Sequence, residues 1–165
     1  MASLRSFIIR HISGRYMKRS LMVTAPLKAR RDFHARMTRL PVASDVRVTS
    51  ETIDGIACEW LVPNGCDDAP VLYFLHGGAY IMGSPATHRR LISFIARAAG
   101  MRAVSPDYRL APEHRYPSQL EDSMRVWRAL LRGGLDPAQM AIGGDSAGGN
   151  LSVATMLSLR DAGEA

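Results

Sequence analysis

A serine flanked by glycines stands between two apolar segments late in the 165-residue sequence. Residues 139–143 form a short apolar run with the length of a buried strand, and residues 150–157 have the pattern of a helix that packs on a sheet. A sharp turn from strand into helix strains its central residue and needs small residues two positions away on either side, as Gly144 and Gly148 are. We therefore predict that Ser146 is exposed at a helix N-terminus, where a hydrolase carries its nucleophile.

A glycine-rich segment follows an earlier strand-like run. Residues 70–75 are apolar and lead directly into His76-Gly77-Gly78-Ala79-Tyr80. Acyl transfer builds negative charge on a carbonyl oxygen, and backbone amides held in a tight loop can point at that charge without reorganising. A nucleophile turn after one strand and an oxyanion loop after another serve one purpose, so the two motifs together indicate acyl transfer.

Three segments resemble those of the hormone-sensitive-lipase-like esterases, an α/β-hydrolase group also called bacterial lipase family IV. They are His76-Gly77-Gly78-Ala79-Tyr80, Asp107-Tyr108-Arg109-Leu110-Ala111-Pro112-Glu113-His114 and Gly144-Asp145-Ser146-Ala147-Gly148-Gly149-Asn150, in the family's order. The resemblance runs from about Val46 onward and covers the N-terminal half of the family's fold. It implies an α/β protein with the α/β-hydrolase fold: a mostly parallel sheet, flanking helices and an N-terminal helical cap segment, truncated after the nucleophile helix.

The resemblance also assigns roles at the site. Ser146 is the expected nucleophile, and the backbone amides of Gly77, Gly78 and Ala147 are the expected oxyanion hole. The family usually has a third glycine where this chain has Ala79. The expected loop donors precede this position, so the departure bears on the shape of the pocket rather than on the hole.

Four further residues are expected to support these groups. His76 belongs to the oxyanion loop, where an imidazole that braces the turn is favoured over a general base. The resemblance suggests that Arg109 and Glu113 join Asp145 in a buried polar network beside the nucleophile, since a guanidinium can bind two carboxylates through forked hydrogen bonds. The alternative is that these charges are merely solvated.

The pattern lacks a general base for the serine. The family's triad runs Ser, Asp, His along the chain, whereas all five histidines precede the serine: His11, His34, His76, His88 and His114. His88 is interpreted as a capping or surface residue. Loss of a triad member leaves ~10³- to 10⁴-fold catalysis over water, so we expect this chain to be nearly inactive by itself. The nucleophile strand should also have a bare edge, typical of a fragment that aggregates or stays partly disordered.

The other elements follow from apolar periodicity and from the positions of glycines. We predict strands over 45–50 and 57–62 joined by an Asp54-Gly55 hairpin, a helix over 91–99 that stops at Gly100, a strand over 102–105, an ordered loop over 107–117, and a helix over 118–131 that ends at Gly133-Gly134.

Basic charge is concentrated at the N-terminus. Residues 1–41 carry a net charge of +9, whereas residues 42–165 carry −3. Basic and apolar residues interleave there as in amphipathic helices. The resemblance implies that residues 1–41 are a basic cap segment, because such helices cap the active site and help to line the acyl pocket in that family, and that residues 42–165 are the N-terminal part of the α/β-hydrolase domain. A transit peptide and weak contact with a membrane surface are alternatives, and no motif for nucleic-acid binding accompanies the charge.

No cofactor or metal is expected. The glycine-rich segment 143–149 lacks the ending of a phosphate loop and the spacing of a dinucleotide fingerprint. No pair of His or Cys residues has metal-ligand spacing, and Cys58 and Cys66 are expected to be free thiols. The apolar run Phe7-Ile8-Ile9 is too short for a signal peptide or a membrane span, so a cytoplasmic location is the default.

Two functions fit the pattern. The first is a carboxylic ester hydrolase that acts on small or medium apolar esters, with the small-molecule ester as its partner. The second is a non-catalytic module that binds a small ligand in the same pocket, and the missing base motivates it. The sequence leaves the natural substrate and the oligomeric state open.

Overall fold

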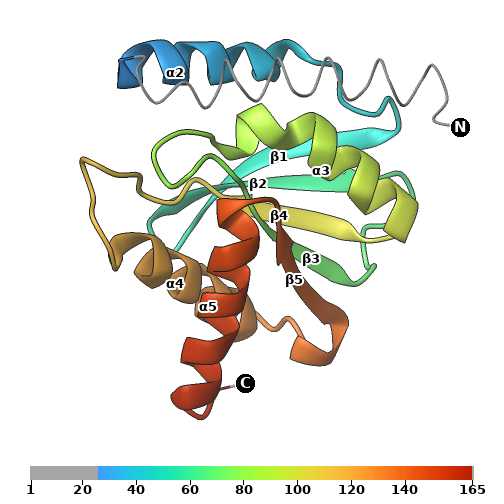
Figure 1. Cartoon of the computed structure of the whole chain (residues 1–165). Helices are drawn as coiled ribbons and strands as arrows, with labels where there is room; N and C mark the ends of the chain where they lie inside the picture. The colour runs from blue at the N-terminus through green and yellow to red at the C-terminus, as the bar shows by residue number, and fades with distance from the viewer. Residues whose placement is uncertain (1–25, 165) are drawn as a thin grey trace, which may run out of the picture.

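The computed structural model describes residues 26–164, which form a sheet with helices on both faces (Figure 1). In chain order the elements are α2 (Leu27–Ala35), the 3-10 helix η1 (Arg36–Arg39), β1 (Val46–Ile53), β2 (Ile56–Pro63), β3 (Val71–Leu75), α3 (Pro85–Ala99), β4 (Arg102–Pro106), α4 (Ser118–Arg132), the 3-10 helix η2 (Pro137–Gln139), β5 (Met140–Gly144) and α5 (Ala147–Asp161). The predicted strands and helices from residue 45 onward are confirmed, and α3 and α5 are longer than predicted. Amphipathic helices, a transit peptide or membrane contact are predicted for residues 1–41. α2 lies within this segment, and residues 1–25 of the segment lie outside the described residues.

The strands within residues 26–164 form one sheet in the order β1-β2-β4-β3-β5. β1 pairs with β2 and β2 with β4 in antiparallel fashion, while β3 pairs in parallel with both β4 and β5. β2 therefore runs against the other strands, and the mostly parallel sheet is confirmed. Asp54 and Gly55 have φ of 47° and 81°, as a two-residue hairpin turn of this kind requires, and they close the predicted β1–β2 hairpin.

Helices cover both faces of β3, and all of its residues are buried. Successive side chains of a strand point to opposite faces. Tyr73 and Leu75 therefore pack in the cluster that includes α4 and α5, whereas Leu72 and Phe74 pack in the cluster that includes α3. The continuous apolar sequence of β3 is explained by burial on both sides, and the α/β class is confirmed.

Local sequence sets both ends of α3. The Ser84 side chain accepts a hydrogen bond from the Thr87 amide (3.2 Å), and the Thr87 hydroxyl accepts one from the Ser84 amide (3.0 Å). This capping box satisfies amides that have no acceptor within the helix, and Pro85 follows in the first helical position, where its missing N–H has no cost. The helix ends at Gly100, whose φ of 63° is left-handed. The stop predicted at Gly100 is confirmed.

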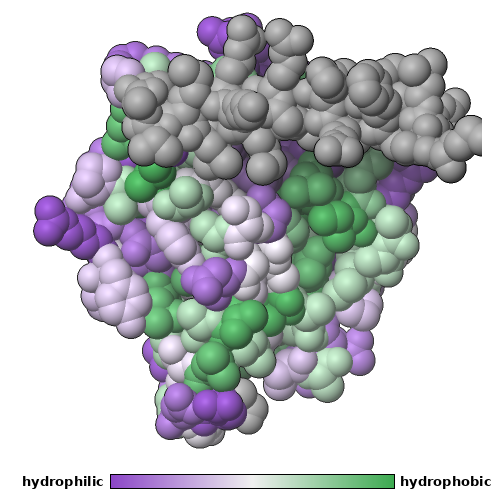
Figure 2. Space-filling model, in the orientation of Figure 1, coloured by the Kyte–Doolittle hydropathy of each residue, from purple (hydrophilic) through white to green (hydrophobic). Residues whose placement is uncertain are grey.

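β5 lies at an edge of the sheet in the described part of the chain, where its strand partner is β3. The helices on either side of this edge expose apolar side chains: Leu91, Phe94 and Ile95 on α3, and Val153 and Leu157 on α5. Figure 2 shows apolar side chains gathered over α3 and α5 on this face. The bare edge predicted for the serine-bearing strand is confirmed for residues 26–164. A free edge between apolar helix faces favours association with further polypeptide.

Arg31 attaches α2 to loops of the sheet domain. Its guanidinium donates to both carboxylate oxygens of Glu113 (2.7 and 2.8 Å) and to the carbonyls of Ile81 (2.7 Å) and Ala111 (3.0 Å). The cap role of this segment and a domain boundary after residue 41 stay predictions. In the part of the chain that the structure describes, no helix is both long and apolar enough to cross a bilayer.

The core beneath α3 can be tested with neighbouring residues. Ile92 is fully buried, whereas Leu91 is 42% exposed. Replacing Ile92 by Ala should lower the free energy of unfolding by about 2–5 kcal/mol, because it removes apolar contacts and leaves a cavity. Leu91→Ala, the control, should change it by less than about 1 kcal/mol. Urea unfolding followed by circular dichroism measures both, and equal effects would contradict the described packing of α3.

Candidate active site

The serine lies at a sharp turn between β5 and α5. β5 ends at Gly144 and α5 begins at Ala147, and we call residues 144–148 the serine turn. Ser146 is exposed and has φ 51° and ψ −118°. A residue with a side chain rarely adopts positive φ, and such strained residues cluster at functional sites. The predicted strained, exposed serine at a helix N-terminus is confirmed, while its chemical role stays a prediction.

Two glycines allow the serine turn to lie against the end of β3. A Cβ atom on Gly144 or on Gly148 would overlap the carbonyl of Leu75. A Cβ atom on Gly143 would lie 3.8 Å from the side chain of Leu72, an ordinary contact distance. The small residues predicted on both sides of the serine are therefore required by a close approach of backbones.

The chain leaves β3 through residues 76–80, which we call the glycine loop. Gly78, Ala79 and Tyr80 have successive positive φ of 128°, 54° and 62°. The amides of Ile81 and Met82 both donate to the Gly78 carbonyl at 3.1 Å and close the loop. A Cβ atom on Gly78 would overlap the Met82 backbone, so glycine is required there. Ala79 occupies a left-handed conformation that would suit the family's third glycine.

The sheet brings the glycine loop and the serine turn together. β3 and β5 are parallel neighbours, with Leu75 opposite Gly144, so both connections leave the same edge of the sheet. The Gly77 amide donates a hydrogen bond of 2.8 Å to Oδ1 of Asp145, the residue directly before the serine. Segments that are far apart in the sequence thus form one site.

The same hydrogen bond corrects one predicted role. The prediction that the Gly77 amide belongs to an oxyanion hole is wrong, because Asp145 already accepts its N–H. Within residues 26–164, the structure records no acceptor for the amides of Gly78, Ala79 and Ala147. Ala147 begins α5, and amides in the first turn of a helix lack an acceptor within the helix. These three amides can therefore serve a ligand.

A family model described as the alpha/beta hydrolase fold matches residues 72–165, which include the glycine loop and the serine turn. The chain belongs to the α/β-hydrolase family.

Curated relatives of this α/β-hydrolase chain include hydrolases of esters. The acetyl-hydrolase of Streptomyces hygroscopicus is 42% identical over 112 residues, which are 68% of this chain and 37% of the relative. Esterase LipI of Mycobacterium tuberculosis is 37% identical over 138 residues, which are 77% of this chain and 43% of the relative. The chain spans less than half the length of these relatives.

Solved structures give the same result. An esterase from the bacterial hormone-sensitive lipase family superposes with a TM-score of 0.88 and 38% identity, over 100% of this chain and 55% of that one. EstE5, crystallised and soaked with p-nitrophenyl butyrate, superposes with a TM-score of 0.83 and 38% sequence identity. The match covers 92% of this chain and 53% of EstE5. The predicted resemblance of this α/β-hydrolase to hormone-sensitive-lipase-like esterases, over about half of their length, is confirmed.

The predicted network of Arg109 and Glu113 with Asp145 is wrong. Arg109 donates to Asp122 of α4, at 2.9 Å from Nε and 2.7 Å from a terminal nitrogen, and its backbone amide donates to the same carboxylate at 2.9 Å. Glu113 binds Arg31 of α2. The reason is local, because the start of α4 brings Asp122 beside the loop that carries Arg109.

His76 supports the glycine loop from within the core. Its Nδ1–H donates to the Gly77 carbonyl (2.9 Å), and its ring stacks on Tyr108 with centroids 4.1 Å apart and planes at 7°. The Tyr108 hydroxyl in turn donates to the His76 carbonyl (2.5 Å). Burial lowers the pKa of His76 to about 4, although the Gly77 carbonyl opposes this shift. The imidazole is therefore neutral near pH 7, and these contacts support the bracing interpretation.

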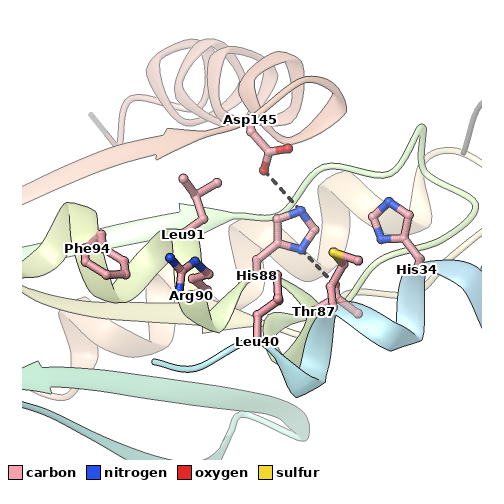
Figure 3. A pocket seen from close by; sticks show the side chains of 9 residues that line it. His34, Leu40, Thr87, His88, Arg90, Leu91, Phe94 and Asp145 are labelled. Carbon is pink, nitrogen blue, oxygen red and sulfur yellow. Dashed lines mark hydrogen bonds and ion pairs between the residues drawn. The ribbon is translucent and has the colours of Figure 1, made fainter. Parts of the chain in front are cut away.

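His88 is buried, so its interpretation as a surface residue is wrong, whereas its contacts with Ser84 and Thr87 do place it at the cap of α3. It lies near the start of α3, with Nε2 3.5 Å from Oδ1 of Asp145 and Nδ1 2.8 Å from the Thr87 hydroxyl (Figure 3). Burial alone would raise the pKa of Asp145, but the hydrogen bond and charge of His88, helped by the Gly77 amide, lower it below its usual value. No motif marks His88, because only the fold brings it to the serine turn.

Two pockets adjoin this region. One of about 450 Å³ lies between η1, α3 and Asp145 and is lined by His34, Met37, Leu40, Thr87, His88, Arg90, Leu91, Phe94 and Asp145 (Figure 3). Another of about 310 Å³ lies beside α5 and is lined by Tyr80, Ala111, Tyr116, Gln119, Leu120, Asn150, Leu151 and Ala154. Among the residues that the structure describes, no group of three or more His, Cys, Asp or Glu side chains could hold a metal ion.

The close approach of the serine turn to β3 predicts that residue 148 must be glycine. Gly148→Ala should lower the free energy of unfolding by about 1–3 kcal/mol or more, because the new Cβ displaces the Leu75 carbonyl. Gly143→Ala, on β5 just before the serine turn, is the control and should stay within about 1 kcal/mol of the original chain. Thermal unfolding of both variants measures the difference, and a tolerated alanine at 148 would contradict the geometry.

Burial of His76 predicts a pH dependence of stability. The pKa of His76 is about 4 in the fold, against the ordinary value of 6.5. Between these values the unfolded chain binds more protons, so stability is full above about pH 6.5 and decreases by about 3 kcal/mol as pH falls to about 4. His76→Phe retains an aromatic ring but cannot titrate, so urea midpoints should vary less with pH in this variant. An unchanged pH dependence would refute the assignment.

Proposed function

We propose that this chain carries the nucleophile and the oxyanion-binding amides of a serine carboxylic ester hydrolase. One observation supports the proposal above all: a strained, exposed Ser146 is joined to the glycine loop by the hydrogen bond from Gly77 to Asp145. The names acetyl-hydrolase and esterase among the relatives support the same class of reaction.

In the proposed reaction, the Ser146 hydroxyl oxygen bonds to the ester carbonyl carbon while a base takes its proton. The carbonyl electron pair moves to the oxygen, and the amides of Gly78, Ala79 and Ala147 donate to the resulting oxyanion. The helix dipole at the start of α5 adds positive potential there. Collapse breaks the ester C–O bond, and the alcohol leaves with a proton. Water then attacks the acyl-serine, releases the acid and restores the hydroxyl.

The described residues supply no general base in contact with the Ser146 hydroxyl. Within residues 26–164, the structure records no hydrogen bond between an imidazole and the Ser146 hydroxyl. His76 binds the Gly77 carbonyl and His88 faces Asp145. We therefore propose that this chain hydrolyses esters slowly. Its rate enhancement over water should be at most ~10³- to 10⁴-fold, which an oxyanion hole and substrate binding provide without a base.

The proposed substrate is a small or medium apolar ester. The pocket of about 310 Å³ beside α5 exposes mostly apolar side chains. Tyr80, at the end of the glycine loop, donates its hydroxyl to Asn150 in the first turn of α5 at 2.7 Å, so this pocket begins at the proposed site. At about 310 Å³ the pocket lies at the lower end of the range of about 300–1,000 Å³ found for drug-sized ligands. This size suits a short acyl or alcohol group.

The proposal predicts that hydrolysis depends on one serine. Ser146→Ala should remove all turnover of p-nitrophenyl butyrate above the buffer rate, since the nucleophile is absent. Ser158→Ala, at the far end of the same helix, should retain the original rate. Release of p-nitrophenol measures both variants. Equal rates for the Ser146 variant and the original chain would reject the proposal.

A non-catalytic ligand-binding module is the second candidate, favoured by the lack of a base at Ser146 in the described residues. A fluorophosphonate separates the two functions, because it bonds covalently to a nucleophilic serine. Since no base contacts Ser146 in the described residues, the reaction should be slow, but in an esterase mass spectrometry should locate the adduct on Ser146 after a long incubation. Binding of butyrate esters without hydrolysis and without an adduct would favour the module.

A further inference from the structure

His88 reaches the serine turn from another part of the fold. Its Nε2 lies 3.5 Å from Oδ1 of Asp145, and the same oxygen accepts the Gly77 amide at 2.8 Å. A carboxylate only accepts hydrogen bonds, so this contact is favourable when Nε2 carries a proton. One carboxylate thus joins α3 to the glycine loop, and none of the proposed chemical steps uses this connection.

The helix cap fixes the orientation of the His88 ring. Nδ1 lies 2.8 Å from the Thr87 hydroxyl and 3.1 Å from the Ser84 carbonyl, and both of these groups belong to the capping box of α3. These two contacts hold the ring with its Nε2 side toward Asp145. Buried hydrogen-bonded supports of this kind hold a site in place.

The position of Gly77 decides where the following amides point. A Cβ atom on Gly77 would overlap the Asp145 carboxylate, so the loop lies in direct contact with it. The next residue, Gly78, has φ 128° and turns the chain sharply. A shift of the Asp145 carboxylate would therefore move the Gly78 and Ala79 amides, and displacements of about 1 Å can cost about 100-fold in rate.

We propose that His88 is a positioning residue for the glycine loop: it holds the Asp145 carboxylate, which in turn holds the Gly77 amide. The consequence for catalysis rests on the proposed function, while the consequence for the Gly77 amide does not. His88 touches no reacting atom and acts only through Asp145.

The charged and titratable groups around His88 come from several elements. His34 of α2 stacks on it with centroids 6.0 Å apart, and His76 lies 5.5 Å away on the glycine loop. Asp145 faces it from the serine turn. On α3 itself, Arg89 binds Glu59, and the Arg90 guanidinium donates to the Pro41 carbonyl and lies over the Phe94 ring. Asp145 is thus the anion that His88 meets.

The first experiment follows the Gly77 amide by ¹H–¹⁵N NMR and measures its protection from hydrogen exchange. In the original chain the amide should be protected, because Asp145 accepts its N–H. In His88→Gln the side-chain amide can still donate to Asp145, so the protection of Gly77 should be retained. In His88→Leu the protection should decrease. If His88→Leu fails to fold, a His88→Gln variant that folds but leaves Gly77 unprotected would still contradict the proposal.

The second experiment measures Ser146-dependent hydrolysis of p-nitrophenyl butyrate. His88→Leu should lower kcat by about 10- to 100-fold with little change in KM, because the loop amides act on the transition state. His88→Gln should restore most of the rate, and His114→Gln, the same substitution at an exposed histidine, should have no effect. An unchanged Gly77 signal together with an unchanged kcat in His88→Leu would overturn the proposal. If the Ser146→Ala variant hydrolyses the ester as fast as the original chain, the proposed function fails, and the Gly77 signal still decides the role of His88.

Discussion

The close approach of the serine turn to the end of β3 is the constraint from which the rest of the site follows. Hydrogen-bonded parallel strands bring Leu75 opposite Gly144, but side chains at 144 and 148 would keep the turn away from the Leu75 carbonyl. Two glycines remove this obstacle. The contact between the serine turn and β3 lets the Asp145 carboxylate reach the glycine loop. It also holds Ser146 at a strained φ, which is maintained only where the surrounding structure is well packed.

A single carboxylate then joins three elements of different origin. Asp145 follows β5, Gly77 follows β3, and His88 belongs to α3. Burial disfavours the charge of this carboxyl, and two donors compensate, so its pKa remains below the ordinary value. Charge-assisted hydrogen bonds of this kind are roughly twice as strong as neutral ones and are directional. The residue beside the serine is therefore an ordered carboxylate whose hydrogen bonds go to Gly77 and His88. The amides of Gly78 and Ala79 remain for a ligand.

The two cores of the described chain lie on either side of β3. Tyr73 packs toward α4 and α5, and Leu72 packs toward α3. Among the described residues β5 pairs on one side alone, and apolar side chains of α3 and α5 beside it are exposed (Figure 2). The chain matches 55% of an esterase with the same fold. The cores that hold the candidate site therefore lie within the described chain, while one sheet edge is left for further polypeptide.

The sequence by itself determined the elements, the family resemblance and the position of the serine. Each follows from local physics: apolar runs with strand or helix periodicity, glycines at a close approach, and a positive φ at Gly100 that ends α3. Tertiary structure decided which polar groups meet. Arg109 finds Asp122, Glu113 finds Arg31, and the Gly77 amide is taken by Asp145. Side-chain partners depend on distances between elements, and no spacing along the chain encodes them.

His88 and Gly77 show this division most clearly. The start of a helix can be predicted from Ser84 and Thr87, but the direction in which the His88 ring points depends on how α3 lies across the sheet. In the same way, the glycine pattern predicts a loop with exposed amides. Whether the Gly77 amide binds a ligand or the Asp145 carboxylate depends on where β5 ends, because that position brings Asp145 to the loop. Local sequence sets backbone conformation because sterics act between neighbours. Hydrogen-bond partners depend instead on which elements lie side by side in the folded sheet.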